Sequence, residues 1–299
     1  MTFSATLIIL MALIGEVGFM VINAMARRLR VGGGASRAIL GAYGLTLPLW
    51  AGVLTYFAMN GQLELQWPYL LCVAVWLGVC YAMNFGTVFI SSFQSLSEGT
   101  GYRFGFSVLL ALLLDVVVFK TSFSPELLLV LGTLFAGGFF LHIGRAKQDY
   151  KNTRLVPLHL KLGFVALVSV AEVAAYALFK YGATMQDSVF AHNALSQALL
   201  FTLFLVMGGR IMIRDNKDGY LPMPYIIGFM VLVVIALSAN AVAIAALPIT
   251  LFVMFSLIRA ACFTVQDVKA RGVGFSVSTI LALVLIAAGM ALTLTLQGF

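Results

Sequence analysis

Long apolar stretches recur along the whole chain, and this feature restricts its possible folds more than any other. Each stretch has about 20 residues with few charges, which is the length that an α-helix needs to cross the hydrocarbon core of a bilayer. On this criterion we predict ten membrane-spanning helices. They cover residues 3–26, 36–59, 67–91, 96–119, 124–144, 158–180, 187–209, 222–246, 247–266 and 273–297.

The composition indicates the same class of protein. Hydrophobic residues make up 62% of the chain and charged residues only 10%, which is too few to form the surface of a water-soluble fold. In lipid, backbone polar groups must be paired within a helix or within a closed barrel. The alternating pattern of a barrel strand is absent, so we expect an all-α integral membrane protein. The first span carries Glu16 in its middle, so we expect it to be a retained helix and not a cleaved signal peptide.

The positive charges indicate how the chain is oriented. Most Lys and Arg residues follow the first, fifth, seventh and ninth predicted spans, and the largest group lies in the polar linker 145–157. Lys120 and Lys180 are the basic residues of the opposite connections. Basic loops mark the cytoplasmic side, so we predict that both termini lie outside, in a membrane such as the bacterial inner (plasma) membrane. The net charge of +7 then reflects topology, and no nucleic-acid partner is expected.

An internal repeat connects the two halves of the chain at an offset of 156 residues. It relates four pairs of positions: Glu16 and Glu172, Pro68 and Pro224, Asn84 and Asn240, and Arg103 and Arg259. After the last pair the offset shortens by four, so that Gly137 corresponds to Gly289. Five spans per half is an odd number, so the second half must enter the membrane upside down. We therefore predict two inverted five-helix repeats, 1–144 and 158–299, joined by the basic cytoplasmic linker 145–157.

Several short motifs resemble a known family. Ala171-Glu172-Val173, followed by Leu178-Phe179-Lys180, resembles the first helix of the small multidrug resistance proteins. Trp67-Pro68 at the start of the third span, and the segment from Lys120 to Pro125 before a glycine-rich helix, extend this similarity. The chain as a whole resembles the ten-helix branch of the drug/metabolite transporter superfamily, in which two such halves are fused. This resemblance implies export of a small solute in exchange for protons.

Glu16 and Glu172 are the central candidates for a functional site. Each lies about 13 residues into its span, which is roughly halfway through the bilayer at about 1.5 Å per residue. An ionised carboxylate at that depth costs at least ~2.5 kcal/mol, so it should face the protein interior and either become neutral or find a cationic partner. Such a group is suited to exchanging a proton for a cationic solute. The alternative is a structural carboxylate that is hydrogen-bonded between helices.

Five further residues are candidates for contacts with substrate. Arg103 and Arg259 could pair with the Glu residues or hold a carboxylate or phosphate through a bidentate guanidinium; alternatively, the first snorkels to the interface and the second forms a structural ion pair. Asn84 and Asn240 could bind substrate or could only join neighbouring helices. Tyr176, one turn after the second Glu, could contact substrate or belong to the core.

Other polar residues are expected to be structural. Asp115 lies close in sequence to Lys120, which predicts an ion pair near the outer surface. The histidines His142, His159 and His192 lie near span ends without forming a cluster, which is typical of interfacial side chains. The three cysteines lie inside spans without paired spacing, so neither a disulfide nor a metal site is expected.

These patterns together predict a secondary active transporter. The expected mechanism is proton-coupled antiport, exporting a small cationic or zwitterionic metabolite or drug-like compound by alternating access at a midplane site. The alternative, which the two arginines would favour, is an exchanger or flippase for an anionic or lipid-linked metabolite. No enzyme motif such as GxSxG or HExxH is present, so enzymatic activity is not expected. The expected partners are a small-molecule substrate, protons and the lipid bilayer, without a cofactor, and the protein is expected to be a monomer or homodimer.

Overall fold

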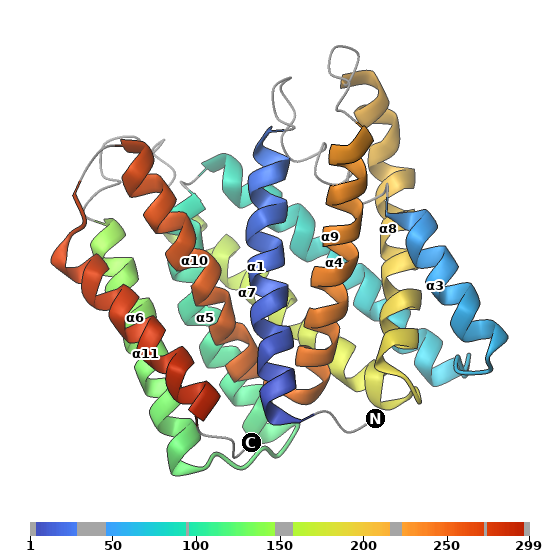
Figure 1. The fold of residues 1–299 in the computed structure, drawn as a ribbon, viewed down its shortest axis with the longest axis horizontal. Coiled ribbons are helices and arrows are strands. Elements are labelled where there is room, and N and C mark those ends of the chain that lie inside the picture. The colour runs from blue at the N-terminus through green and yellow to red at the C-terminus, as the bar shows by residue number, and fades with distance from the viewer. Residues whose placement is uncertain are drawn as a thin grey trace. The chain divides into compact units, whose positions relative to one another are not determined.

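A computed structural model describes residues 4–28, 46–93, 96–146, 158–215, 223–271 and 274–295. Within these ranges the regular structure consists of α-helices, and no strand is present (Figure 1). In chain order the helices are α1 (Ala5–Arg28), α3 (Leu47–Met59), α4 (Trp67–Phe93), α5 (Leu96–Val117), α6 (Pro125–Ala146), α7 (Leu158–Thr184), α8 (Val189–Asp215), α9 (Met223–Ala246), α10 (Ile249–Arg271) and α11 (Val277–Thr295). The all-α class is confirmed, and each of these helices overlaps one of the predicted spans.

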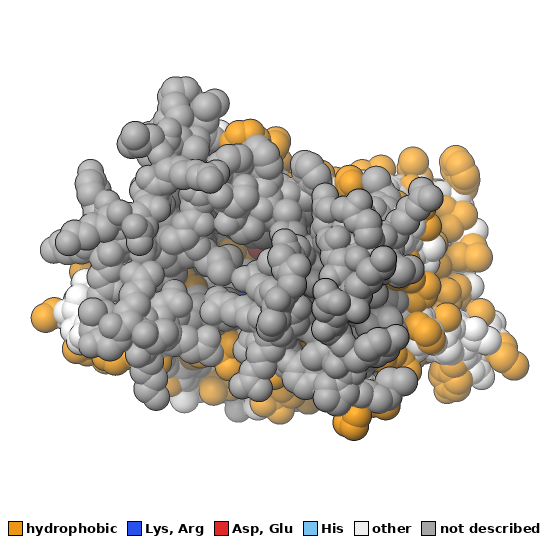
Figure 2. Space-filling view, turned by 90° about the horizontal axis from the view of Figure 1, so that it is seen from above, with side chains coloured by type: hydrophobic (Ala, Val, Ile, Leu, Met, Phe, Trp, Pro, Cys, Tyr) orange, Lys and Arg blue, Asp and Glu red, His pale blue; other side chains and the backbone are white. Residues whose placement is uncertain are grey.

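Five of the described helices are long and apolar enough to cross a membrane. Their apolar stretches are Ala5–Ile22, Gly163–Thr184, Val189–Val206, Ile227–Ala246 and Val277–Thr295. The other five helices have shorter apolar stretches within the described residues. Most of the described side-chain surface in the space-filling view is hydrophobic (orange, Figure 2). These features are those of an integral membrane protein.

Proline residues mark the starts of several helices. Pro48, Pro68 and Pro224 occupy the second residue of α3, α4 and α9, and Pro125 is the first residue of α6. Pro248 directly precedes α10. The backbone N–H groups in the first turn of a helix have no partners within the helix, so proline, which lacks an N–H, costs little stability there. Further along a helix, proline removes a hydrogen bond and disrupts the helix. The local sequence therefore sets where these helices begin.

The chain forms two compact units, and each contains segments from both halves of the sequence. Unit 1 consists mainly of Met11–Gly78 and Leu178–Ala245. Unit 2 consists of Thr2–Leu10, Val79–Ala177 and Ala246–Phe299. The helices α1, α4 and α7 contribute residues to both units. The division at the linker 145–157 stays a prediction, because most of that linker lies outside the described residues.

In unit 1, α3 packs along α8, and α1 packs closely against α9. Tyr69, Val73 and Leu195 form a buried apolar cluster between α4 and α8. The approach of α1 to α9 depends on glycine: a Cβ atom built on Gly15 would overlap the side chain of Asn240. A larger residue at this position would have to displace the Asn240 side chain.

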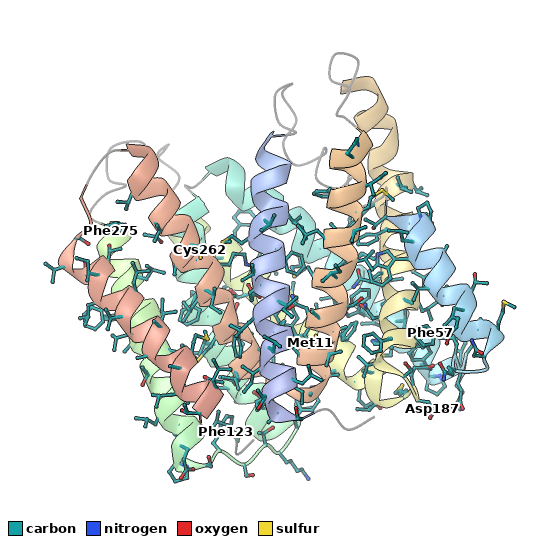
Figure 3. All side chains as sticks on the ribbon, in the orientation of Figure 1. Met11, Phe57, Phe123, Asp187, Cys262 and Phe275 are labelled. Atoms are coloured by element: carbon teal, nitrogen blue, oxygen red, sulfur yellow. The ribbon has the colours of Figure 1, made fainter. Side chains whose placement is uncertain are left out.

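The loop after α3 is tied to the turn between α7 and α8. Gly61 has a φ of 66°, a left-handed conformation that lets the chain leave the helix and that glycine adopts without strain. Beyond it, the Glu64 backbone N–H donates to Gln186 Oε1 (3.0 Å), and Gln186 Nε2 donates to the Glu64 carbonyl (2.6 Å). Phe57 and Asp187 accordingly lie at the same end of unit 1 (Figure 3).

In unit 2, α6 and α11 form an antiparallel pair (green and red, Figure 1). Phe123, just before α6, and Phe275, just before α11, lie at opposite ends of this pair (Figure 3). A Cβ atom on Gly137 would lie 2.8 Å from Ile286 Cγ1, and a Cβ atom on Gly289 would lie 2.5 Å from Leu134 Cδ2. The two glycines therefore let the helix backbones approach closely, as small residues commonly do in membrane helices.

Asp115 on α5 joins that helix to the start of α10, also within unit 2. Its side chain is fully buried. One carboxylate oxygen accepts a hydrogen bond from the Ile249 N–H (3.0 Å), and the other accepts from the Thr250 N–H (2.7 Å) and the Thr250 hydroxyl (2.7 Å). The predicted ion pair with Lys120 is therefore wrong. The N–H groups at a helix start have no partners within their own helix and carry the positive end of the helix dipole, so they compete well for a carboxylate.

Replacing Asp115 with Asn is expected to lower the free energy of unfolding by about 1 kcal/mol, because the amide retains one acceptor but turns an NH₂ group toward the second backbone N–H. Thermal unfolding in detergent measures this loss. Asp187→Asn, in the exposed turn before α8, is the control and should leave the melting temperature unchanged. Equal melting temperatures for the two variants would contradict a capping role for Asp115.

Candidate functional site

The candidate site with the fullest geometry surrounds Glu172 on α7. Its side chain is only 8% exposed, in the middle of an apolar helix. The Ser107 hydroxyl on α5 donates a hydrogen bond to Glu172 Oε2 (2.9 Å), and the Tyr176 hydroxyl donates to Oε1 (3.1 Å). Each carboxylate oxygen is thus held by a neutral hydroxyl group. Because a hydroxyl can donate or accept, the same two partners can satisfy Glu172 in its charged and in its protonated form.

An aromatic pair continues this site toward α10. The ring of Tyr176 meets that of Phe252 edge to face, with centroids 5.0 Å apart and an interplanar angle of 82°. Phe252 is buried, so its ring limits the positions that Tyr176 can take. The edge-to-face contact and the hydrogen bond to Glu172 together fix the phenol at one edge of the carboxylate. A buried carboxylate beside aromatic side chains suits an amine or another cation, which its negative charge attracts.

The two predicted arginines lie on different helices, Arg259 on α10 and Arg103 on α5. Arg259 is half-buried on α10, the helix that also carries Phe252. Arg103 belongs to α5, but its side chain lies outside the described residues. The choice between ion pair and substrate contact for these arginines therefore stays a prediction.

Glu16 and Asn240 lie in unit 1. Glu16 is 2% exposed, so this carboxylate too is enclosed by protein. The residue before it, Gly15, faces the Asn240 side chain on α9, which is also buried. The predicted counterpart of this amide, Asn84 on α4, has a side chain outside the described residues. Glu16 therefore directly follows, along α1, the glycine that packs against Asn240 of α9.

A second set of buried polar side chains lies on α8, where sequence reasoning expected none of functional interest. His192, Asn193, Ser196 and Gln197 are all buried, and His192 is only 1% exposed. His192 is enclosed by protein near the start of α8: its Nδ1 lies 3.0 Å from the Tyr69 hydroxyl, and its ring packs on Phe179 with centroids 4.4 Å apart.

A sequence signal for this second set does exist. The polar positions in HNALSQ recur at i, i+1, i+4 and i+5, which places them on one side of an otherwise apolar helix. Ser107, the partner of Glu172, had no comparable signal, because a single Ser in an apolar span is common and its partner is 65 residues away.

The fold is shared with a known structure. A solved structure, described only as a protein, superposes with a TM-score of 0.62 at 17% sequence identity, over 96% of this chain and 98% of its own. This similarity concerns the fold alone. No protein-family model matches the sequence, and no curated protein is similar enough to it to count as a match.

Proposed function

We propose that the protein is a secondary active transporter that exchanges protons for a small cationic or zwitterionic solute at Glu172. The observation that carries this proposal is the buried carboxylate with a neutral hydroxyl on each oxygen. A group that must alternate between charged and protonated forms needs partners that serve both, and hydroxyls do so by rotating. A structural carboxylate would be better served by fixed donors, such as the backbone N–H groups that hold Asp115.

The binding step follows from competition for the carboxylate. When Glu172 is ionised, its charge and the neighbouring rings of Tyr176 and Phe252 attract an amine. When a proton binds instead, the charge disappears and the amine loses its main attraction. Because proton and solute exclude each other, the site carries one or the other across the membrane in each half-cycle. This exclusion is the condition for antiport.

Alternating access requires two halves that can rearrange around the site, and an inverted repeat would supply them. The contacts between α6 and α11 support such a repeat. At the shortened offset of 152 residues, Gly137 corresponds to Gly289 and Leu134 corresponds to Ile286. The contact of Gly137 with Ile286 then maps onto the contact of Gly289 with Leu134, as expected for halves related by a pseudo-two-fold axis.

The test is solute-driven proton movement in proteoliposomes of the full chain. A pH-sensitive dye trapped inside reports protons released when primary amines, amino acids or matched carboxylates are added outside. We expect amines or amino acids to give a signal that protein-free liposomes lack. Signals from carboxylates alone would favour the second candidate, an exchanger or flippase for an anionic metabolite, for which the half-buried Arg259 is the specific feature.

Arg259→Lys separates these two functions. For a cationic solute bound at Glu172, we expect the variant to bind amines within about twofold of the wild type, because a side chain that does not hold the solute contributes little to its affinity. Amine binding should also weaken from pH 8 to pH 5, since protonation of the carboxylate removes the attracting charge. For an anionic solute, binding would tolerate acid and would be lost in Arg259→Lys, which keeps the charge but loses the bidentate fork. Equilibrium binding of matched amines and carboxylates is the measurement.

A further inference from the structure

Helix α8 carries four buried, uncharged polar side chains in unit 1 that the proposed transport step does not use. His192, Asn193, Ser196 and Gln197 have exposed fractions of 1%, 1%, 0% and 6%. Their spacing places them on one side of the helix, which we call the α8 polar face. Buried polar groups in proteins are nearly always hydrogen-bonded, so any that are not require an explanation.

Three atoms of the α8 polar face have no hydrogen-bonding partner among the described residues: His192 Nε2, Asn193 Nδ2 and Ser196 Oγ. A serine inside a helix commonly donates to the carbonyl four residues earlier, as Thr202 on the same helix does to Ala198 (2.7 Å). Ser196 makes no such bond. Within the described part of the chain, no hydrogen bond from these three atoms joins α8 to another helix.

The neighbouring contacts hold these groups in defined orientations. Gln197 Nε2 donates to Asn193 Oδ1 (3.2 Å). This bond orients the Asn193 amide, whose Nδ2 group has no hydrogen-bonding partner among the described residues. The Tyr69 hydroxyl lies 3.0 Å from His192 Nδ1, and a Cβ atom on Gly182 would lie 2.7 Å from the imidazole Cε1. The imidazole ring of His192 thus packs against residues of α4 and α7. Its Nε2 has no hydrogen-bonding partner among the described residues. Fixed polar groups with unused hydrogen bonds are typical of a binding site.

The available hydrogen bonds define the ligand chemistry. Asn193 Nδ2 offers an N–H donor. His192 Nε2 offers a donor when the Tyr69 hydroxyl donates to Nδ1, and an acceptor in the other neutral tautomer. Ser196 can donate or accept. None of the four side chains in the face is then charged, so an ion would lose its hydration there without gaining a counter-charge. We propose that the α8 polar face binds a small uncharged solute through carbonyl or hydroxyl oxygens.

This proposal goes beyond the proton exchange at Glu172, because it needs neither that carboxylate nor a pH gradient. Direct binding to the purified full-length protein in detergent tests it, with radiolabelled N-methylacetamide and erythritol as neutral probes, methylammonium and acetate as charged ones, and empty micelles as background. We expect the neutral probes to bind at least about tenfold more tightly than the charged ones. Glu172→Gln should bind the neutral probes as the wild type does, so failure of the transport proposal leaves this result intact.

Ser196→Ala is the diagnostic variant. It should weaken binding of the neutral probes about fivefold, the usual effect of one neutral hydrogen bond, while the melting temperature of the probe-free protein stays unchanged or rises. The rise is expected because alanine removes a buried hydroxyl that has no partner. Thr202→Val, which removes a hydroxyl bonded within α8, is the matched control and should bind the probes normally.

Three outcomes would overturn the proposal. The first is that no neutral probe binds the wild type above the micelle background, which would mean that only water occupies the α8 polar face. The second is that Ser196→Ala and Thr202→Val weaken binding of the neutral probes equally. The third is a lower melting temperature in Ser196→Ala, which would show that the hydroxyl joins helices.

Discussion

Glu172→Gln is expected to reduce solute-driven proton movement about a hundredfold or more, the usual range for loss of a group that transfers the proton. Gln retains the shape of the side chain but cannot be protonated or ionised in the accessible pH range. Ser107 and Tyr176 can rotate their hydroxyls to meet an amide, so the variant should keep its fold. Dye-loaded proteoliposomes measure the activity, and thermal unfolding in detergent measures the stability.

The matched control for this variant is Glu126→Gln. Glu126 lies exposed in the first turn of α6, so the same chemical change occurs there outside the site. The control should transport at the wild-type rate. Wild-type transport by Glu172→Gln would show that this carboxylate does not couple protons to solute. If Glu172→Gln instead melted well below the wild type, a structural role for the carboxylate would explain its loss of activity.

Gly137→Leu is expected to destabilise the protein by about 3 kcal/mol. A Cβ atom alone would lie 2.8 Å from Ile286 Cγ1 and 3.1 Å from the Ile286 backbone nitrogen. The side-chain atom could move, but the backbone atom can move only with the whole of α11. The extra side chain must therefore separate α6 from α11 and expose the surface that they bury together. Thermal unfolding in detergent at several detergent concentrations measures the change.

Gly132→Leu provides the control on the same helix. A Cβ atom at Gly132 meets nothing within 4 Å, so the substitution adds a side chain in open space. It should leave stability unchanged or raise it by up to about 1 kcal/mol, because leucine favours a helix more than glycine does. If both variants lost the same stability, a general intolerance of α6 to larger residues, and not the contact with α11, would be responsible.

The sequence alone determined the class of fold and most of its elements. Runs of about 20 apolar residues can satisfy their backbone hydrogen bonds in lipid only as helices, and this requirement depends on local composition. Pro68 and Pro125 were likewise placed at helix starts from neighbouring residues alone, and α4 and α6 begin there. The depth of Glu16 and Glu172 within their spans could also be counted along the chain, and both side chains are buried in the structure.

The tertiary structure decided which residues meet, because in a uniformly apolar chain little in the sequence distinguishes one helix face from another. Asp115 was expected to bind Lys120, five residues away, but it caps the start of α10, 134 residues along the chain. Ser107 gained its significance only when α5 brought its hydroxyl to Glu172. His192 lies near the end of its helix in sequence, yet packing against α4 and α7 encloses it. The N–H groups of a first helical turn and buried hydroxyls form hydrogen bonds with the partners that packing brings within about 3 Å. These partners can be far away in the sequence.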